Sequence, residues 1–379
     1  MKKLVIALSV LTTSAILLIG ALWFYNKNNE PKKETTPSKE VELEEYEDKV
    51  SKISFIATGD ALIHGAVYKR AYKNGIYDFN YQIEHIKPII EGYDLAFYNQ
   101  ETIFGGSSLG YSHYPRFNTP SEFGDAMLAA GFNIVGLANN HSLDKGEIGV
   151  NNAINYWQNT KVLWDGINTN QAMQDEKPKI YEKNGITYTM LSYTTTTNGL
   201  YISSKPYLVN VYSKELVLKD INAIKDEVDI IMVSMHWGNE YWQTPAAEQI
   251  AIAEYLSSLG VSIIIGHHPH VLQPITKINN TIVMYSLGNF ISAQDTNTKL
   301  TGMLVSLDIT KTTNKSGTII EIDNLNAELI YTVKAKGYVV TPYTMLNDGV
   351  LPGYKTLYEN QKKVIQSLDP TISVTPLTK

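Results

Sequence analysis

Histidine, acidic and asparagine residues gather in a few short segments of this sequence. The densest is His267-His268-Pro269-His270, where imidazoles stand almost side by side. They cannot all point into an apolar core, and their mutual repulsion disfavours protonation unless a metal ion or a carboxylate is near. If the segment is extended, His268 and His270 lie on one side and His267 on the other, so that pair is the better candidate for binding a metal. We therefore expect a metal site here.

Further segments hold the same kinds of residue: Gly59-Asp60, Asn99-Gln100-Glu101, Asn139-Asn140-His141 and His236-Trp237-Gly238-Asn239-Glu240. Taken singly, Asp60 is explained as a turn former or helix cap, and His236 as a buried imidazole with a hydrogen-bond partner. The chain has no cysteine, so any metal must bind to nitrogen and oxygen atoms. Imidazoles with carboxylate and amide oxygens suit Mn, Fe or Zn, and two such ions support in-line phosphoryl displacement.

Three neighbouring residues have weaker signals. Asp144 follows His141 closely and can orient its imidazole through a hydrogen bond, or it can cap the helix expected over 146–159. Asn289, in the segment YSLGNF, can line the same site, although a plain turn explains it nearly as well. For His64, four residues after Asp60, a solvated position on a helix is favoured over a place in the site.

The polar segments come directly after short apolar runs that are typical of buried strands. These runs are ISFIAT (53–58), DLAFY (94–98), NIVGLA (133–138), DIIMVS (229–234) and SIIIG (262–266). Helical patterns lie between them, and 303–340 adds consecutive strands. This alternation predicts an α/β fold with a mixed sheet or two packed sheets, covered by helices on both sides. In open α/β sheets ligands bind beyond the carboxyl ends of strands. Because each of these polar segments directly follows a predicted strand, we expect them to form one site.

The N-terminal region predicts a membrane anchor. Residues 4–25 carry no charge and end in aromatic residues, so 1–25 are expected to form a single transmembrane helix with the bulk of the chain outside the cell. A signal peptide cleaved near Ile19-Gly20-Ala21 is the alternative. Residues 26–51 are charged and predict a flexible linker, 52–345 the folded domain, and 346–379 a C-terminal extension.

Length and charge limit the class of protein. The chain has 379 residues and a net charge of -6, so it can bury a substantial core and lacks the electrostatic footprint of a nucleic-acid binder. We therefore expect no nucleic-acid partner.

The sequence resembles the CapA family of poly-gamma-glutamate capsule synthesis proteins, which are similar to calcineurin-like metallophosphatases. The resemblance covers about residues 52–310 and depends on TGD (58–60), NQE (99–101), ANNHSLDKG (138–146), HWGNEY (236–241), GHHPHVLQPI (266–275) and YSLGNF (285–290), in family order. It implies a layered α-β-β-α sandwich with mixed sheets. It also implies a part in making or exporting an anionic surface polymer at the cell membrane, beside membrane proteins of a polymer synthase, with an anionic polymer or a phosphoester as substrate.

The resemblance also assigns roles to residues. It implies one or two divalent ions, held by Asp60, Glu101, Asn140, His236, His268 and His270. His141 would be the acid or the phosphate-facing imidazole, with Asp144 beside it in the catalytic group. Residues expected to contact substrate or orient the ligands are Asn99, Asn139, Glu240, His267 and Asn289.

The sequence departs from the standard metallophosphatase pattern in two places. Leu62 stands where a D-x-H motif would have histidine, and Glu101 stands where a GD motif would supply a bridging aspartate. The sequence therefore leaves three functions open. These are a metal-dependent hydrolase, a scaffold that binds metal and polymer without catalysis, and a spore or cell-envelope protein of the same family.

Overall fold

The computed structural model describes residues 2–29 and 48–377, with side chains from Ala15 onward. The chain divides into two compact units, Met1–Tyr46 and Glu47–Lys379. In the first, α1 (Lys2–Asn28) is the described element, and most of the predicted linker, residues 30–47, lies outside the described residues. The second unit holds every other described element, and the predicted domain limits stay predictions.

The prediction of a membrane anchor over residues 1–25 is wrong. None of the helices in the described part of the chain is both long and apolar enough to cross a membrane. The single-pass cell-membrane localisation that followed from this anchor is therefore wrong as well.

Two mixed sheets form the centre of the second unit. The larger has the order β16-β15-β14-β1-β4-β5-β6, with β13 beside β1 and β17 beside β15. Its strands are β1 (Lys49–Ala61), β4 (Leu95–Asn99), β5 (Ile134–Gly136), β6 (Leu163–Asp165), β13 (Asn289–Ile291), β14 (Thr301–Asn314), β15 (Gly317–Val333), β16 (Val339–Pro342) and β17 (Ser373–Val374). Strands β1, β4, β5 and β6 are parallel. Successive strands in the order β1-β14-β15-β16 are antiparallel, whereas β17 pairs in parallel with β15.

The smaller sheet has the order β11-β12-β10-β9-β8-β7. Its strands are β7 (Tyr181–Lys183), β8 (Ile186–Thr194), β9 (Ile230–His236), β10 (Ile263–His267), β11 (Ile275–Ile278) and β12 (Thr281–Met284). The four inner strands are parallel and almost wholly buried, which agrees with their mostly apolar sequences. A separate hairpin pairs β2 (Tyr72–Lys73) with β3 (Ile76–Tyr77).

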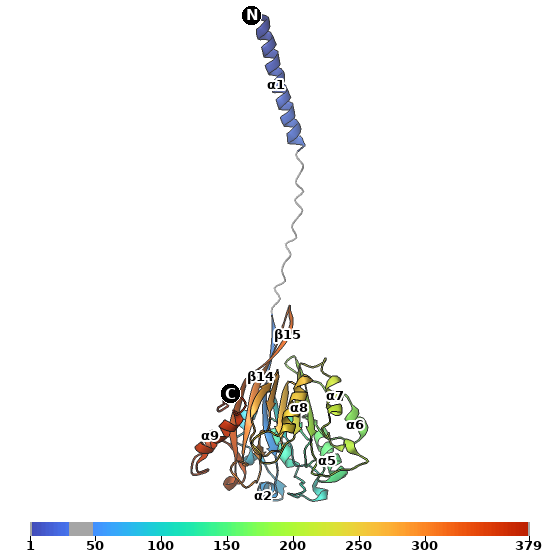
Figure 1. The fold of residues 1–379 in the computed structure, drawn as a ribbon, viewed down its shortest axis with the longest axis vertical. Coiled ribbons are helices and arrows are strands. Elements are labelled where there is room, and N and C mark those ends of the chain that lie inside the picture. The colour runs from blue at the N-terminus through green and yellow to red at the C-terminus, as the bar shows by residue number, and fades with distance from the viewer. Residues whose placement is uncertain (1, 30–47, 378–379) are drawn as a thin grey trace. The chain divides into compact units, whose positions relative to one another are not determined.

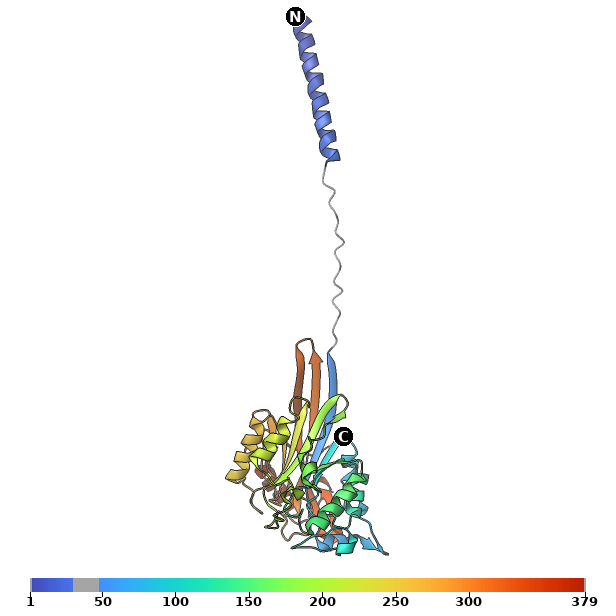
Figure 2. The same cartoon turned by 90° about the vertical axis from the view of Figure 1, so that its right-hand side faces the viewer.

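The two sheets pack face to face. Alternate residues of β1, such as Ile53 and Phe55, join Met190 and Ile263 of the smaller sheet in one buried cluster, because successive side chains of a strand point to opposite faces. The outer face of each sheet packs against helices, and Figure 2 shows helices on both sides of the strands. The predicted α/β fold is therefore confirmed, with four layers in the order helix, sheet, sheet, helix.

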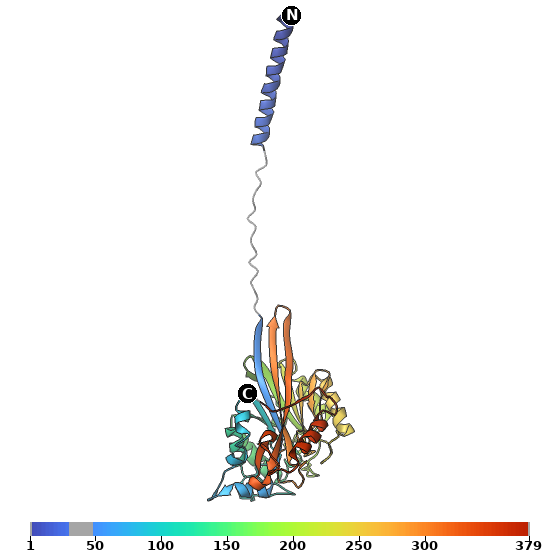
Figure 3. The same cartoon turned by 90° about the vertical axis from the view of Figure 1, so that its left-hand side faces the viewer.

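The helices of this unit are mostly short. They are α2 (Gly65–Ala71), α3 (Lys87–Ile90), α4 (Glu122–Ala129), α5 (Gly146–Gln158), α6 (Gln171–Asp175), α7 (Lys214–Asn222), α8 (Ala247–Ser258) and α9 (Tyr354–Ile365). The last one, drawn in red in Figure 3, belongs to the C-terminal extension, where β17 also adds to the larger sheet. Strands β14 and β15 continue beyond the rest of this unit together with the start of β1 (Figure 1).

Candidate metal centre

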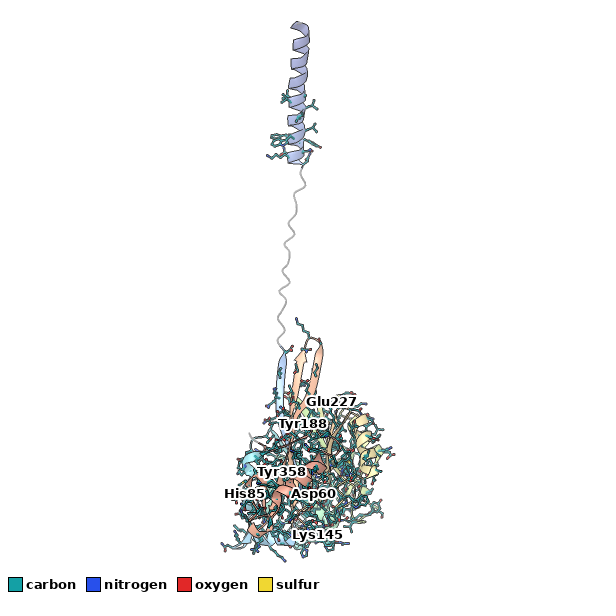
Figure 4. The ribbon with its side chains drawn as sticks, turned by 60° about the vertical axis from the view of Figure 1, so that its left-hand side comes forward. Asp60, His85, Lys145, Tyr188, Glu227 and Tyr358 are labelled. Atoms are coloured by element: carbon teal, nitrogen blue, oxygen red, sulfur yellow. The ribbon has the colours of Figure 1, made fainter. Side chains whose placement is uncertain are left out.

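The ends of four parallel strands bring the predicted polar residues to one place. Asn99 ends β4, His236 ends β9, His267 ends β10, and Asp60 is the last but one residue of β1. Asp60 stands in register with Asn99, and His236 with His267. Parallel strands end at the same edge of a sheet, so the two packed sheets offer their polar ends to a common space, near Asp60 in Figure 4.

Asp60 is fully buried among hydrogen-bond donors. Its Oδ1 accepts from Asn99 Nδ2 at 2.8 Å, and its Oδ2 accepts from the His268 backbone N–H at 3.2 Å. His267 Nδ1 and His270 Nδ1 each lie 3.3 Å from a carboxylate oxygen. Burial opposes ionisation, but the hydrogen bonds and positive charge of His267 and His270 outweigh it and hold the pKa of Asp60 well below its ordinary value. Asp60 is therefore a carboxylate.

Close approach of the backbone fixes the position of Asp60. A Cβ atom at Gly59 would collide with the carbonyl oxygen of Gly288, and that oxygen accepts the Asp60 backbone N–H at 2.9 Å. Glycine thus allows the loop before β13 to contact β1 directly. This contact explains why the segments TGD and YSLGNF, far apart in the chain, both contribute to the site.

Glu101 is buried, and neither of its carboxylate oxygens has a hydrogen-bond partner. Its Oε1 lies 3.5 Å from His270 Nε2 and 3.8 Å from His236 Nε2. Burial raises the pKa of Glu101 well above its ordinary value, and the nearby charge of Asp60 adds to that effect. A buried carboxylate without partners costs free energy unless it is neutral or binds a cation.

His236 presents a neutral imidazole to the same space. Its Nε2 lies 3.0 Å from Asn140 Oδ1, its Nδ1 has no hydrogen-bond partner, and its ring centroid is 4.7 Å from that of His268. Burial, followed by the charge of His268, holds the pKa of His236 well below its ordinary value. Neutral imidazole is the form that binds metal ions.

The segment after β10 is not extended, which corrects the alternation expected there. His268 has φ 95° and His270 has φ 57°, in the left-handed region that non-glycine residues seldom adopt. Burial lowers the pKa of His268 to about 4. Burial alone would also lower that of His270, but Glu101 and Asp60 raise it to about 9. Because the loop turns, all three of its imidazoles reach the site, His267 included.

His141 and Asp144 form a buried pair beside this cluster. His141 Nδ1 lies 2.8 Å from Asp144 Oδ2, which also accepts the Phe117 backbone N–H at 2.6 Å. The Phe117 ring packs edge-on against His141, with centroids 4.6 Å apart. Asn139 Oδ1 accepts the His141 backbone N–H at 3.0 Å. Asp144 and Phe117 therefore hold the imidazole, and Asn139 holds the His141 backbone. Of the two explanations for Asp144, the structure shows the hydrogen bond to His141.

The structure also places the other predicted residues. Asn289 Oδ1 lies 3.0 Å from His270 Nδ1, so it orients that ring. Glu240 is exposed but can join His268 and His270 in one set of ligand atoms. His64 is partly buried rather than solvated: its Nδ1 accepts the Ala293 backbone N–H at 3.2 Å, and burial lowers its pKa to about 4.

Three overlapping groups within the described residues have ligand atoms close enough to share an ion. They are Glu101 with His236 and His268, Asp60 with Glu101 and His270, and Glu240 with His268 and His270, each group having its atoms within 4.8 Å of one another. Glu101 supplies two unpaired oxygens, and His236 and His268 each have an unpaired Nδ1. Buried ligand atoms without partners fit a divalent cation.

Comparison with known proteins identifies the family. Residues 54–294 match the family model described as bacterial capsule synthesis protein PGA_cap. The chain belongs to this family. Every residue that contributes to the three ligand groups lies within the matched range. The PGA_cap match therefore contains the whole candidate metal centre.

Two relatives carry capsule names. The chain is 30% identical to PGA biosynthesis protein CapA of Bacillus subtilis over 66% of this chain and 65% of that protein. It is 28% identical to capsule biosynthesis protein CapA of Bacillus anthracis over 75% of this chain and 68% of that protein. The match thus spans about two thirds of the length of either relative.

Solved structures resemble this PGA_cap chain more distantly. A putative 5'-nucleotidase from Staphylococcus aureus has a TM-score of 0.48 and 16% identity, covering 82% of this chain and 58% of that one. The sulfate thiohydrolase SoxB from Thermus thermophilus has a TM-score of 0.39 and 12% identity, covering 76% and 46%. Similarity this low supports no assignment of activity.

The PGA_cap site differs from a D-x-H centre at one position. Leu62 is buried, with 2% of its surface exposed, and belongs to the apolar core. A hydrocarbon side chain cannot bind a metal ion, and no other described residue adds a second histidine next to Asp60 on β1. The ligand atoms near Asp60 come instead from the loop after β10.

Sequence analysis missed one related residue, Asp165. It ends β6, which is the next strand after β5 in the same sheet. The signal was present, because the sequence Leu163-Trp164-Asp165-Gly166 is a short apolar run followed by a polar residue. Its contacts nevertheless keep it apart from the centre, since its Oδ2 accepts the Ser192 backbone N–H at 2.7 Å.

Proposed function

We propose that this chain is a metal-dependent hydrolase of the phosphoesterase type, acting in the synthesis or export of poly-gamma-glutamate or a related anionic surface polymer. The observation that carries the proposal is Glu101, a fully buried carboxyl group whose two oxygens have no hydrogen-bond partner and face His236 and His270. A buried carboxyl group with two unpaired acceptor oxygens is costly unless it binds a cation.

The chain's own residues would hold one or two divalent ions. Asp60, Glu101, His236, His268 and His270 supply the ligand atoms, and the mixture of imidazole and carboxylate favours Mn, Fe or Zn. Asn140 would bind beside His236, whose Nε2 it contacts. When bound, such an ion polarises a phosphoryl or carboxyl oxygen and lowers the pKa of a coordinated water.

His141 is positioned to transfer a proton. Asp144 accepts from Nδ1, which fixes the ring orientation and leaves Nε2 as the atom that can exchange a proton with substrate. The Phe117 ring restricts movement of the imidazole. In this proposal His141 protonates the leaving oxygen, while Asp144 stabilises the imidazolium form.

The test uses the full-length chain loaded with Mn, Zn or Fe. Cleavage of bis(p-nitrophenyl) phosphate and of poly-gamma-glutamate is compared among the wild type, His141→Ala and His268→Ala, with His85→Ala as a control outside the site. We expect His268→Ala to lose metal and turnover, and His141→Ala to keep metal but lose most turnover. Metal uptake with no turnover that responds to either variant would contradict the hydrolase.

A non-catalytic scaffold is the second candidate, and the buried Leu62 favours it because a standard binuclear centre would have histidine there. As a scaffold, the chain would bind metal and anionic polymer beside a membrane synthase. Saturable binding of poly-gamma-glutamate that requires metal, without cleavage, would support this function. Neighbouring genes for a ligase-like synthase and a small membrane partner would support the capsule pathway for either candidate.

A further inference from the structure

A second pocket lies in the C-terminal part of the chain, beyond residues 54–294 of the family match. It has a volume of about 290 Å³ and lies among β15, β17, α9 and the turn at Tyr343–Met345. The lining side chains that matter for its chemistry are Glu328, Tyr343, Tyr354, Lys355, Tyr358 and Glu359. A pocket of this size accepts a small molecule or the end of a long side chain.

Glu328 supplies a buried carboxyl group to this pocket. It is 4% exposed, and its Oε2 accepts the Leu377 backbone N–H at 2.8 Å. Its Oε1 has one contact, with Thr344 Oγ1 at 3.5 Å, the outer limit of a hydrogen bond. No lysine, arginine or histidine within the described chain forms an ion pair with it, and burial raises its pKa. Glu328 is therefore a carboxyl group with unused acceptor capacity.

Tyrosine rings form the walls next to Glu328. Tyr343 and Tyr358 lie with ring centroids 5.8 Å apart. Their hydroxyl groups are already bonded, to Thr301 Oγ1 at 2.8 Å and to the Val374 carbonyl oxygen at 3.0 Å. What these residues offer a ligand is therefore ring surface. At the Tyr354 ring, Lys355 Nζ stands 5.9 Å from the centroid, so this ring already attracts a cation.

We propose that this pocket binds a small organic ammonium group, with Glu328 as its counter-ion and the tyrosine rings as its walls. A carboxylate neutralises the ammonium charge, while aromatic faces stabilise the attached carbon atoms and the cation. An anion is disfavoured because Glu328 and Glu359 outnumber Lys355. A wholly apolar ligand would leave Glu328 Oε1 with only its long contact to Thr344. The proposal is independent of the metal centre.

The experiment titrates the full-length chain with n-butylammonium and with 1-pentanol, a neutral compound of similar size, by calorimetry or NMR. We expect n-butylammonium to bind saturably and 1-pentanol at least tenfold more weakly. Glu328→Gln, which keeps the size of the side chain, should weaken n-butylammonium at least tenfold. Equal binding of the two compounds, or an unchanged affinity in Glu328→Gln, would overturn the proposal.

If Glu328→Gln does not fold, variants of other residues that line the pocket test the proposal instead. Tyr354→Ala should weaken n-butylammonium several-fold while Tyr354→Phe retains it, because the ring provides the contact. Lys355→Ala should bind at least as tightly as the wild type, since a like charge is removed. A Tyr354→Ala affinity equal to that of the wild type would contradict the ring wall.

Discussion

Asp60 and Asp165 stand at equivalent places in one sheet but in opposite surroundings. Both lie at the carboxyl ends of parallel strands, β1 and β6. Asp60 meets His267 and His270, which lower its pKa against the effect of burial. Asp165 meets the Ser192 backbone N–H and the amide of Asn210, and burial raises its pKa to about 7, with the charge of Asp220 adding to the rise.

The difference comes from the facing sheet. Strand β1 faces β10, whose end carries the histidines, whereas β6 faces β8, whose end offers main chain and hydroxyl groups. A strand end therefore determines where a carboxyl group lies, and the opposite sheet determines whether it is charged. An ionised carboxylate among imidazoles can bind a cation, whereas Asp165, with a pKa of about 7, links its strand to Ser192 and Asn210 through hydrogen bonds.

The largest expected effect is loss of the imidazole that contacts both acids of the centre. His270→Ala removes the side chain next to Asp60 and Glu101 and should lower the free energy of unfolding by about 3–5 kcal/mol, as for other broken buried pairs. Urea unfolding of the metal-free protein measures this. His85→Ala, outside the centre, should stay within about 0.5 kcal/mol of the wild type. A similarly small loss in His270→Ala would show that Asp60 does not depend on imidazole.

A bound metal ion should stabilise the protein through the centre that contains Asp60. Asp165 should not contribute to this effect. At about 100 times its Kd, Zn or Mn should add about 2.7 kcal/mol to the stability, visible as a Tm that falls on adding EDTA. His268→Ala should abolish this response, whereas Asp165→Asn should keep it. A response that survives in His268→Ala would place the ion elsewhere.

A third carboxylate, Asp144, can be used to test whether an acidic residue acts by orienting a neighbouring imidazole, here that of His141. Asp144→Asn weakens the contact to His141 Nδ1, so we expect kcat to fall about 10- to 100-fold with the metal retained. The pH profile of kcat should change as well, which a purely structural role would not produce. An unchanged profile would assign Asp144 to the Phe117 contact alone.

The smallest expected effect is a pH dependence at Asp165. Its pKa is raised from the ordinary 3.8 to about 7, so its contribution to stability is complete below about pH 4 and is lost as the pH rises through about 7. Asp165→Asn stays neutral, and its stability relative to the wild type should therefore rise by at least about 1 kcal/mol between pH 4 and pH 8. If the stabilities of the wild type and of Asp165→Asn, measured by urea unfolding, change equally between pH 4 and pH 8, Asp165 is ionised throughout this range.

Much of the fold could be predicted from the sequence because its parallel strands are buried on both faces. The runs before Asp60, Asn99 and His236 are mostly apolar, and each overlaps an observed strand, although β1 extends beyond its run at both ends. The uncharged run over residues 4–25 predicted a membrane anchor that the structure does not bear out, because none of the described helices is both long and apolar enough to cross a membrane.

The site was less predictable in its details. The strand-end rule brings Asp60, Glu101 and His236 together, as the structure does. It cannot give the left-handed backbone at His268 and His270, because such a conformation is imposed by surrounding contacts rather than by local preference. Nor could it separate Asp60 from Asp165, since that distinction depends on which strand of the other sheet lies opposite.

Because its ligand atoms come from both sheets, the centre has a consequence for biogenesis. The acids are made early in translation and the imidazoles after β9 and β10 much later, so a growing chain cannot complete the set until most of it has emerged. Metal binding would then indicate that the two sheets have packed together correctly. A chain that stops between residues 101 and 236 would lack every imidazole of the three ligand groups.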